Sequence, residues 1–538
     1  MAKRRAQLSL VALTCGLGLL AASAVPSTAS VAARNGGTFN ISLTSGAVDF
    51  LDPALAYLPA SWTLLSATCA GLMRYPNKPP PAGLRIAPDV AAFPPRVSSD
   101  GKTYTFTLRK DARFSDGKPV RADAFARAIS RLLDPGMKSP GAEYAKDIVG
   151  AEAVTAGTRT VPSGVKASGT RLVIRFTRPI PDFPLRTTMR FFCAVPPGLP
   201  PDPEGRAVFA AAGPYFVSEF IRGRRAVLRR NPYYRGGQPH HVDRFIVDMQ
   251  AASPGQVLDQ IEKNQADWGW VPSPFFHDPA RGLARKYGGS RFLLSPGWAL
   301  AGYVLNSHRP LFENNPSLRR AVNFAVDRPA LLRGRGAGRA ADQLVPPGIP
   351  GFRNAAIYPL KRPDVPRARV LARGHLRGRT AVLYAIDVPN ERARAQVLVG
   401  NLERIGLKVD LKTFTPAAYF DQIDNPRAAF DIASHDWLPD YIDPYQYTNL
   451  FFDGRHHGGR SLARFDSPRY NRLMRRAARL RGQARYQAYA DLDLRLSRDA
   501  APYLIIGYWS EPTFVSNRVA VGCLDLTPYP DLAAVCLK

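Results

Sequence analysis

The order strand, helix, strand between residues 380 and 411 constrains the fold more than any other feature of the sequence. Residues 380–384 have the pattern of a buried strand, residues 393–405 that of a helix, and residues 407–411 that of a second strand. Two strands joined through a helix pair in parallel, because a tight hairpin connects only antiparallel strands. The chain is therefore expected to have a mixed α/β fold with a partly parallel sheet.

Strand and helix patterns alternate along most of the chain. Residues 103–108 alternate large apolar side chains with threonines, and they lie between the turn signals Asp100-Gly101 and Asp116-Gly117. A helix is expected next, because apolar residues recur at helical spacing over residues 122–133. Further strands are expected at residues 172–176, 225–228, 245–249 and 303–305, and further helices at residues 256–263 and from Pro316. No repeat of fixed period is visible, which argues against solenoids and propellers.

The length of the chain requires more than one hydrophobic core. A chain of 538 residues exceeds the size at which single cores stop growing, so two or three domains are expected. Its composition is 45% hydrophobic and 22% charged, which is typical of globular proteins and not of disordered ones. We therefore expect an architecture with more than one lobe.

The N-terminus has the layout of a secretory signal peptide. Three basic residues at positions 3–5 precede an uncharged apolar run at residues 8–24, and small residues follow, so cleavage could fall after Ala24 or after Ala33. An uncleaved membrane anchor is the alternative, although the run is short for a span. We assign residues 1–33 to the signal peptide and predict export to the periplasm or to the outer face of the cytoplasmic membrane or cell wall.

The formal net charge is +30, and removing the three cations of the signal peptide leaves +27. Such a balance can indicate nucleic-acid binding. Here the arginines are scattered through every region and the chain leaves the cytoplasm, so no nucleic-acid partner is predicted. Weak attraction to anionic lipids or wall polymers is one interpretation. An arginine-rich composition without a binding role is the other.

Four cysteines remain after export: Cys69, Cys193, Cys523 and Cys536. None forms a C-x-x-C pair, which argues against a zinc or thioredoxin-like site. An even count in an oxidising compartment favours disulfides. Cys523 and Cys536 would close a short C-terminal loop, and Cys69 would then pair with Cys193. Free buried thiols are the alternative.

The sequence has no catalytic motif that would indicate an enzyme. It lacks the nucleophile elbow, the zinc-protease helix, the phosphate loop and the dinucleotide turn. His240-His241 and His456-His457 are adjacent pairs whose side chains point in different directions, so loop histidines are expected instead of a metal site. We predict a protein that is not an enzyme and carries no metal and no cofactor. A secreted hydrolase is the rival interpretation.

Residues 436–444 are the most informative segment for function. They read Asp-Trp-Leu-Pro-Asp-Tyr-Ile-Asp-Pro and follow a short apolar strand. Asp440 could accept hydrogen bonds from an ammonium group, while Trp437 and Tyr441 would exclude water and strengthen the attraction. The alternative is an Asx turn in which the Asp440 side chain caps a backbone amide.

Several segments together resemble the family-5 extracellular solute-binding proteins, the oligopeptide- and dipeptide-binding components of ABC importers. The matching segments are residues 36–39, 51–54, 100–109, 114–117, 213–215, 230–234 and 318–328. Each alone is a weak signal, but they occur in family order over essentially all of the mature chain.

The resemblance implies a two-lobe, periplasmic-binding-protein-like α/β fold of the class II (cluster C) type with an extra inserted domain. The first lobe would comprise residues 34–70, 190–298 and 503–538. The inserted domain would comprise residues 71–189, and the second lobe residues 299–502. A Cys69–Cys193 disulfide would then join the two chain crossings at which the insertion leaves and re-enters the first lobe.

The resemblance also implies a ligand and its partners. Asp440 would hold the α-ammonium of a peptide whose backbone pairs with strand edges near Val48, Asp49, Trp298, Ala299 and Leu300, with Trp298 and Trp437 as cleft walls. Core packing is the alternative role for both tryptophans. Relatives that bind nickel chelates, haem, opines or sugars keep a non-peptide solute open as the ligand. The expected partner is an ABC permease in the membrane, and the protein is expected to be a monomer that closes by a hinge.

Overall fold

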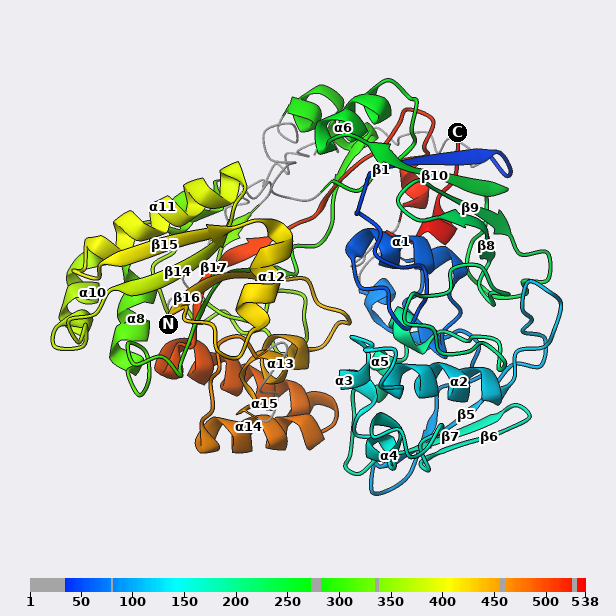
Figure 1. Cartoon of the computed structure of the whole chain (residues 1–538), viewed down its shortest axis with the longest axis horizontal. Coiled ribbons are helices and arrows are strands. Elements are labelled where there is room, and N and C mark those ends of the chain that lie inside the picture. The colour runs from blue at the N-terminus through cyan, green and yellow to red at the C-terminus, as the bar shows by residue number, and fades with distance from the viewer. Residues whose placement is uncertain (1–33, 79–80, 272–281, 334–337, 455–460, 525–529) are drawn as a thin grey trace, which may run out of the picture. The chain divides into compact units, whose positions relative to one another are not determined.

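Three sheets of four or six strands organise the chain (Figure 1). The computed structural model describes residues 34–78, 81–271, 282–333, 338–454, 461–524 and 530–538. The signal peptide and the pair His456-His457 lie outside these residues. Helices and strands alternate as the sequence predicts, and the expected mixed α/β class is confirmed.

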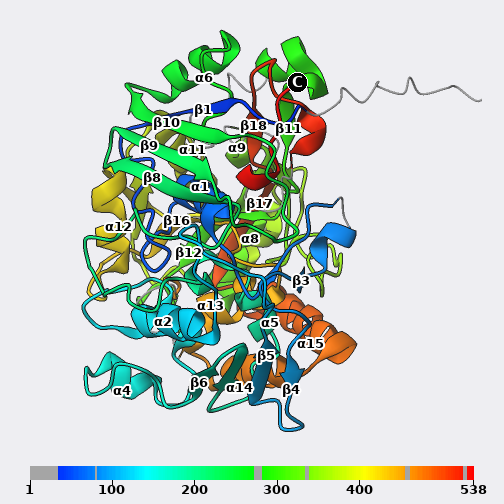
Figure 2. The ribbon, with the colours of Figure 1, turned by 90° about the vertical axis from the view of Figure 1, so that its right-hand side faces the viewer.

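The first sheet has the order β1-β10-β9-β8 (Figure 2). Its strands are β1 (Thr38–Thr44), β10 (Arg244–Ala251), β9 (Arg225–Arg230) and β8 (Tyr215–Ile221). β1 pairs with β10 in parallel, whereas the other neighbours are antiparallel. Alternate residues of β10 are buried, and they share a core with helix α1 (Pro59–Thr68), which lies next to this sheet in sequence and in space.

The second sheet contains the predicted strand–helix–strand unit. Its order is β13 (Arg339–Ala340), β17 (Tyr503–Trp509), β12 (Ala299–Leu305), β16 (Ile432–Trp437), β14 (Ala381–Ile386) and β15 (Val409–Phe414). β14 and β15 are parallel and are joined through α11 (Pro389–Glu403), which confirms the expected unit. The helix begins four residues earlier than predicted, because Pro389 occupies its first turn.

Both faces of the second sheet are covered. Every residue of β12 is buried, and its residues alternate between two hydrophobic cores: Leu300 and Val304 belong to one, Ala301 and Tyr303 to the other. Such continuous burial is the pattern of a strand in the middle of a sheet that lies between helical layers.

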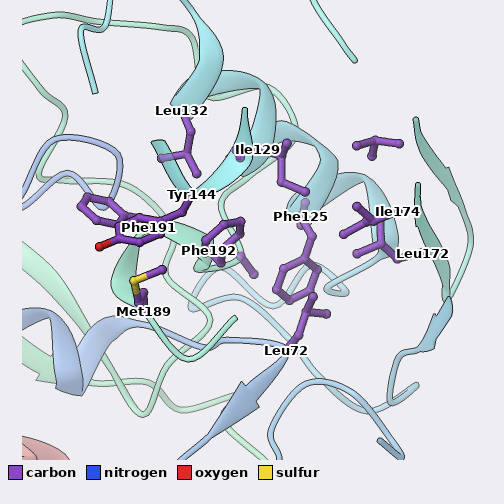
Figure 3. Close-up of a cluster of buried hydrophobic side chains, with 14 of the residues drawn as sticks. Leu72, Phe125, Ile129, Leu132, Tyr144, Leu172, Ile174, Met189, Phe191 and Phe192 are labelled. Carbon is purple, nitrogen blue, oxygen red and sulfur yellow. The ribbon is translucent and has the colours of Figure 1, made fainter. Parts of the chain in front are cut away.

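The third sheet lies within residues 71–189 and has the order β4-β5-β7-β6. Its strands are β4 (Arg96–Val97), β5 (Thr103–Thr107), β7 (Arg171–Arg175) and β6 (Val165–Ser168), and helix α2 (Ala122–Leu133) covers it. Figure 3 shows Phe125 and Ile129 of α2 in one buried cluster with Leu172 and Ile174 of β7. The predicted strand at residues 103–108 and the predicted helix at residues 122–133 are thus present.

The remaining elements connect these sheets or cover them. The other helices are α3 (Ala142–Ala145), α4 (Ala151–Thr155), α5 (Phe183–Arg186), α6 (Pro254–Glu262), α8 (Pro316–Ala325), α9 (Arg328–Leu332), α10 (Val365–Ala372), α12 (Pro416–Asp424), α13 (Asn449–Phe452), α14 (Pro468–Arg479) and α15 (Gly482–Arg495), and the other strands are β2 (Met73–Arg74), β3 (Ala87–Pro88), β11 (Phe292–Leu294) and β18 (Pro512–Phe514). α8 begins at Pro316 as predicted, because the Asn315 side chain accepts a hydrogen bond from the Leu318 amide and so caps the helix. In the described part of the chain, no helix combines the length and the hydropathy needed to cross a bilayer.

One expected boundary needs to be moved. β17 pairs with β12 and β13, so residues 503–509 belong to the six-stranded sheet, whose other strands fall in the expected second lobe. The chain leaves that sheet only after Trp509, and β18 then pairs with β11. The division into two lobes and an insertion otherwise remains a prediction, with its last crossing at about residue 510.

Both predicted disulfides are present. Cys69 is bonded to Cys193 with their Cα atoms 5.3 Å apart, and Cys523 is bonded to Cys536 with their Cα atoms 5.8 Å apart. The first joins the two points at which the chain enters and leaves the segment that contains the third sheet. The interpretation as free thiols is therefore discarded.

Removing the Cys69–Cys193 bond is expected to lower the free energy of unfolding more than removing the Cys523–Cys536 bond. The bonded residues are separated by 124 positions in the first pair and by 13 in the second. A longer loop restricts the unfolded chain more, and the loop-length difference corresponds to about 2 kcal/mol. Urea denaturation of the two paired cysteine-to-serine variants measures this difference, and equal losses would contradict it.

Candidate functional site

The candidate site is built around the loop that follows β16. β16 pairs with β12 along its whole length, but with β14 only at Ile432 and Ala433. Beyond that point the Ser434 carbonyl accepts a hydrogen bond from the Tyr419 hydroxyl. The end of β16 and the loop after it therefore extend beyond the paired part of β14.

Asp440 is held between two tyrosines that come from distant parts of the chain. Its side chain is buried, with the residue 6% exposed. The Tyr57 hydroxyl donates to both carboxylate oxygens, at 3.1 and 3.2 Å, and the Tyr144 hydroxyl donates to Oδ2. The Asp440 amide donates to Gln446 Oε1 at 2.9 Å. The carboxylate thus contacts residues of two distant segments of the chain.

Asp443 caps the turn that follows. Its Oδ1 accepts a hydrogen bond from the Tyr445 amide at 2.9 Å and an ion pair from Arg485 at 2.8 Å. The first partner is two residues away in sequence, and the second belongs to α15, which packs in the same core as the second sheet. An Asx turn is therefore present three residues after Asp440.

The Tyr441 side chain packs in the hydrophobic core of the segment 71–189, so it does not form a cleft wall. Its side chain is 0% exposed and belongs to the hydrophobic core of that segment. Its hydroxyl donates to Asp182 Oδ2 at 2.6 Å, and its ring meets the Tyr144 ring edge-on. The Ile442 amide donates to the Tyr75 hydroxyl oxygen at 3.0 Å. The loop after β16 is thus anchored in a segment some 260 residues away in sequence.

Two buried ion pairs flank this anchor. Asp182 pairs with Arg186 at 2.9 Å and Asp443 pairs with Arg485 at 2.8 Å, and all four side chains are almost completely buried. Burial opposes the ionisation of Asp182, but Arg186 and Arg485 outweigh it and lower its pKa to about 2. Burial raises the pKa of Asp443 against the opposing effect of Arg485. The loop is therefore fixed by charge as well as by packing.

A small pocket of about 30 Å³ is lined by neighbours in sequence of both partners of the Tyr57–Asp440 contact. Pro59 and Leu438 line it, and each lies two residues from one partner of that contact. The indoles of Trp268 and Trp270 form part of its wall. Gly269 separates them, because a side chain there would lie 2.3 Å from the Ser42 carbonyl oxygen. The pocket has the largely apolar lining that is typical of small-molecule sites.

The spacing of two tryptophans is a signal for this pocket in the sequence. Trp268 and Trp270 are two of only six tryptophans, and they lie two residues apart. Their spacing places both on the same side of an extended chain. Trp268 forms bridges to Ile41 and Val515, which brings three distant segments together. These segments come together only in the folded chain. The spacing of the two tryptophans alone would therefore have suggested a shared surface, but not where in the molecule it lies.

The predicted pairing of a ligand with Leu300 is wrong. Leu300 is paired with Trp437 on one side and with Tyr508 on the other, so both of its hydrogen-bonding edges are occupied. Ala299 is paired with Trp509 and is also buried. Trp298 packs in the adjoining core, and its carbonyl accepts a hydrogen bond from Tyr447 at 2.8 Å. β12 is a central strand, and a period-two apolar pattern does not distinguish a central strand from an edge strand.

Asp49 organises the backbone that carries Tyr57. Its carboxylate accepts hydrogen bonds from the Tyr57 amide at 2.8 Å, the Leu58 amide at 3.1 Å and the Ser61 hydroxyl at 2.5 Å. These contacts fix the turn into α1, so Asp49 positions Tyr57. Val48 lies beside it and is buried in the core of the first sheet.

His435 and Trp437 share one face of β16. Their rings are stacked with centroids 6.3 Å apart, and the Phe451 ring meets both edge-on. Burial lowers the pKa of His435 to about 4, against a weaker opposing effect of Asp436. The imidazole is therefore neutral at physiological pH, and Trp437 is half-buried against it.

Lowering the pH from 7 to 4.5 is expected to destabilise the protein partly through His435. The unfolded chain protonates this side chain near its usual pKa of 6.5, the folded chain only near 4, so the unfolded state binds more protons in between. Because the side chain is not fully buried, we expect a loss of about 1–2 kcal/mol.

The variant His435→Phe isolates this contribution in urea denaturation at the two pH values. Phenylalanine keeps an aromatic ring against Trp437 but cannot be protonated. Asp89 and Asp493, whose pKa values burial raises to about 6, act in the opposite direction but equally in both proteins. If the two proteins lose the same stability between pH 7 and pH 4.5, His435 is not responsible.

Metal ligands do not gather in the described part of the chain. No group of three or more His, Cys, Asp or Glu side chains there could hold a metal ion. Of the first histidine pair, His241 lies against the Asn35 side chain and His240 against the Gln238 carbonyl.

Comparisons with known proteins agree with this architecture. The family model described as bacterial extracellular solute-binding proteins, family 5 Middle, matches residues 85–459. The chain is 25% identical over 443 residues to a probable D,D-dipeptide-binding periplasmic protein of Escherichia coli K12, covering 79% of this chain and 80% of the relative. It is 24% identical over 447 residues to an oligopeptide-binding protein of Bacillus subtilis 168, covering 79% of each. The solved structure of a clavulanic acid biosynthesis oligopeptide binding protein has the same fold, with a TM-score of 0.82, 24% identity, and coverage of 94% of this chain and 96% of that one.

Proposed function

Because the chain belongs to the bacterial extracellular solute-binding proteins of family 5, we propose that it captures a peptide outside the cytoplasm and delivers it to an ABC permease in the membrane. Relatives named for binding dipeptides and oligopeptides support a peptide ligand. The protein itself would perform no chemistry, and a separate ATPase would supply the energy for transport.

The observation that carries this proposal is the environment of Asp440. Its buried carboxylate accepts hydrogen bonds from Tyr57 and Tyr144. Leu438, two residues before it, lines a pocket together with Trp268 and Trp270. An ionised carboxylate offers about four lone-pair positions, so an ammonium group can join the two hydroxyls. Away from bulk water such a charge-assisted hydrogen bond is stronger than a neutral one. A peptide amino terminus is the ligand group that fits.

The remainder of the peptide would lie along β16 and in the pocket. Its backbone would pair with the edge of β16 beyond Ala433, where β14 no longer does, in the manner of an added strand. Trp268, Trp270 and Trp437 would contact its side chains. The pocket, at about 30 Å³, would take only one small group of the peptide.

Release and capture would involve a hinge between the two proposed lobes. Two chain crossings run together there, since the Ser295 amide donates to the Glu511 carbonyl at 2.9 Å and the Glu511 amide donates to Ser295 Oγ at 2.8 Å. Rotation about these crossings would separate Asp440 from Tyr57 and Tyr144, and would withdraw Tyr441 from its core. The anchored loop after β16 therefore corresponds to the closed state.

Mass spectrometry of the solute released by denaturing the purified protein tests this function. We expect peptides with free amino termini. A nickel chelate, haem, an opine or a sugar in their place would contradict the peptide ligand while leaving solute binding intact. Cleavage of added peptides by the purified protein would instead indicate a hydrolase.

A further inference from the structure

α14 carries an unusual concentration of positive charge. The helix has twelve residues from Pro468 to Arg479, and five of them are arginines, whereas none is acidic. These arginines are Arg469, Arg472, Arg475, Arg476 and Arg479. The helix thus contradicts the expectation that the arginines are scattered without forming a basic stripe.

Helical geometry gathers these charges on one side. Arg469, Arg472, Arg476 and Arg479 are exposed and recur at intervals of three or four residues, which places them on one face. The opposite face packs into the second sheet's core through Tyr470, Met474, Ala477 and Ala478. At a rise of 1.5 Å per residue, the four exposed arginines extend over about 15 Å. We call these four residues the arginine face.

The arginine face has no ion-paired partner within the described residues, although Arg469 is near enough to Asp499 to add to the effect of Arg498, which lowers the pKa of that carboxyl. None of its members forms an ion pair with an acidic side chain there, although exposed arginines elsewhere do so, as Arg353 with Asp491 at 2.9 Å and Arg392 with Asp387 at 2.6 Å. Like charges three or four positions apart destabilise a helix. The stability of the folded protein alone does not explain this arrangement, which indicates an external anionic partner.

The side chains around the arginine face indicate whether its partner is a protein or an extended anionic surface. A specific protein interface has an apolar centre, often aromatic. No large hydrophobic side chain is exposed on α14 or α15. A row of guanidinium groups without such a centre suits an extended anionic surface, because each group can bind a phosphate through two parallel hydrogen bonds.

We propose that the arginine face is a docking surface for the anionic phospholipid headgroups of the bilayer. Since its apolar side is used for packing in the protein, the helix adsorbs to the headgroups without entering the acyl region. Clusters of four to eight basic residues on one helix are typical of such electrostatic adsorption. The contact would keep the protein near the membrane independently of its ligand.

Vesicle sedimentation tests this proposal. Residues 34–538 are used, because Ala33–Lys538 forms a compact unit without the apolar N-terminal run. The variant Arg472→Gln/Arg476→Gln/Arg479→Gln is compared with the parent protein on vesicles of phosphatidylcholine with and without phosphatidylglycerol. Each basic residue near such a surface contributes about a fivefold factor, so the triple variant is expected to bind the anionic vesicles about a hundredfold more weakly. In 1 M salt the parent should also lose this binding.

A matched variant removes the same charge elsewhere. Arg224, Arg229 and Arg244 are exposed, lie in or next to the first sheet, and form no ion pair within the described residues. Their replacement by glutamine should leave vesicle binding within about threefold of the parent, since charges farther than a Debye length from the bilayer are screened. Equal weakening in both variants, or no binding of the parent to anionic vesicles, would overturn the proposal. Ligand binding should be unchanged in both, which separates this test from that of the proposed function. The triple variant of the arginine face should unfold at a temperature no lower than the parent, because it relieves repulsion between like charges.

Discussion

Replacing Asp440 with alanine is expected to weaken the binding of a peptide with a free amino terminus by at least about a hundredfold. The carboxylate is buried between the Tyr57 and Tyr144 hydroxyls. If it is removed, no bulk water can reach the bound ammonium and take its place. Removing one partner of a buried ion pair costs about 3–5 kcal/mol, because the remaining charge stays desolvated. Isothermal titration calorimetry with a peptide recovered from the purified protein measures the loss.

The amino terminus of the same peptide provides the control. Acetylation removes the positive charge from the ligand, so the parent protein should bind the acetylated peptide as weakly as Asp440→Ala binds the free one. The variant Asp440→Ala should hardly distinguish the two peptides, because the interaction is already lost. Asp440→Asn keeps the shape of the side chain and tests whether the charge is responsible. An unchanged affinity in both variants would refute the proposed role of Asp440.

Replacing Arg131 with methionine is expected to lower the free energy of unfolding by about 3–5 kcal/mol. Arg131 forms two hydrogen bonds with the Asp52 carboxylate, at 2.8 and 2.6 Å, and the two side chains are 1% and 0% exposed. Asp52 also accepts the amides of Ala54 and Arg206 at 3.0 and 2.9 Å. Methionine preserves much of the volume but leaves the carboxylate buried without its counter-charge. Urea denaturation measures the effect.

Two further variants separate the ion pair from the loss of an arginine. Arg127 lies one turn earlier on α2 and donates a hydrogen bond to the Leu199 carbonyl, without an ion pair within the described residues. Arg127→Met is therefore expected to cost about 1 kcal/mol. Asp52→Asn combined with Arg131→Met removes both charges and should cost less than Arg131→Met alone. If Arg127→Met and Arg131→Met destabilise the protein equally, the ion pair is not the cause.

Local patterns in the sequence were sufficient for much of the fold. The strand at residues 103–108, the helix at residues 122–133 and the unit formed by β14, α11 and β15 are all encoded in windows of some ten to thirty residues. The disulfides followed from the count of cysteines and the compartment. The ordered segments that match family 5 were visible without any structure, and the family model confirms them.

Local sequence patterns could not show whether a strand lies in the middle of its sheet or at an edge. Leu300 has the same apolar surroundings in sequence whether β12 is a central strand or an edge strand, and only its pairing with Trp437 and Tyr508 decides. The same holds for Tyr441, whose aromatic and acidic neighbours suit a cleft wall as well as the core in which it lies. Burial depends on what packs against a residue, and that partner is far away in sequence.

By itself the sequence determined the order of elements, the family, the cysteine pairs and the identity of Asp440 as the acid of interest. Only the tertiary structure decided that Tyr57 and Tyr144, which are 383 and 296 positions away, surround this carboxylate. It also decided that Trp268 and Trp270 line the same pocket, and that the arginines of α14 face outward together. The physical reason is the distance along the chain over which each effect acts. Helix and strand periodicity and turn preferences act over a few residues. A binding site is formed by contacts between distant segments, and no local pattern shows which segments will meet.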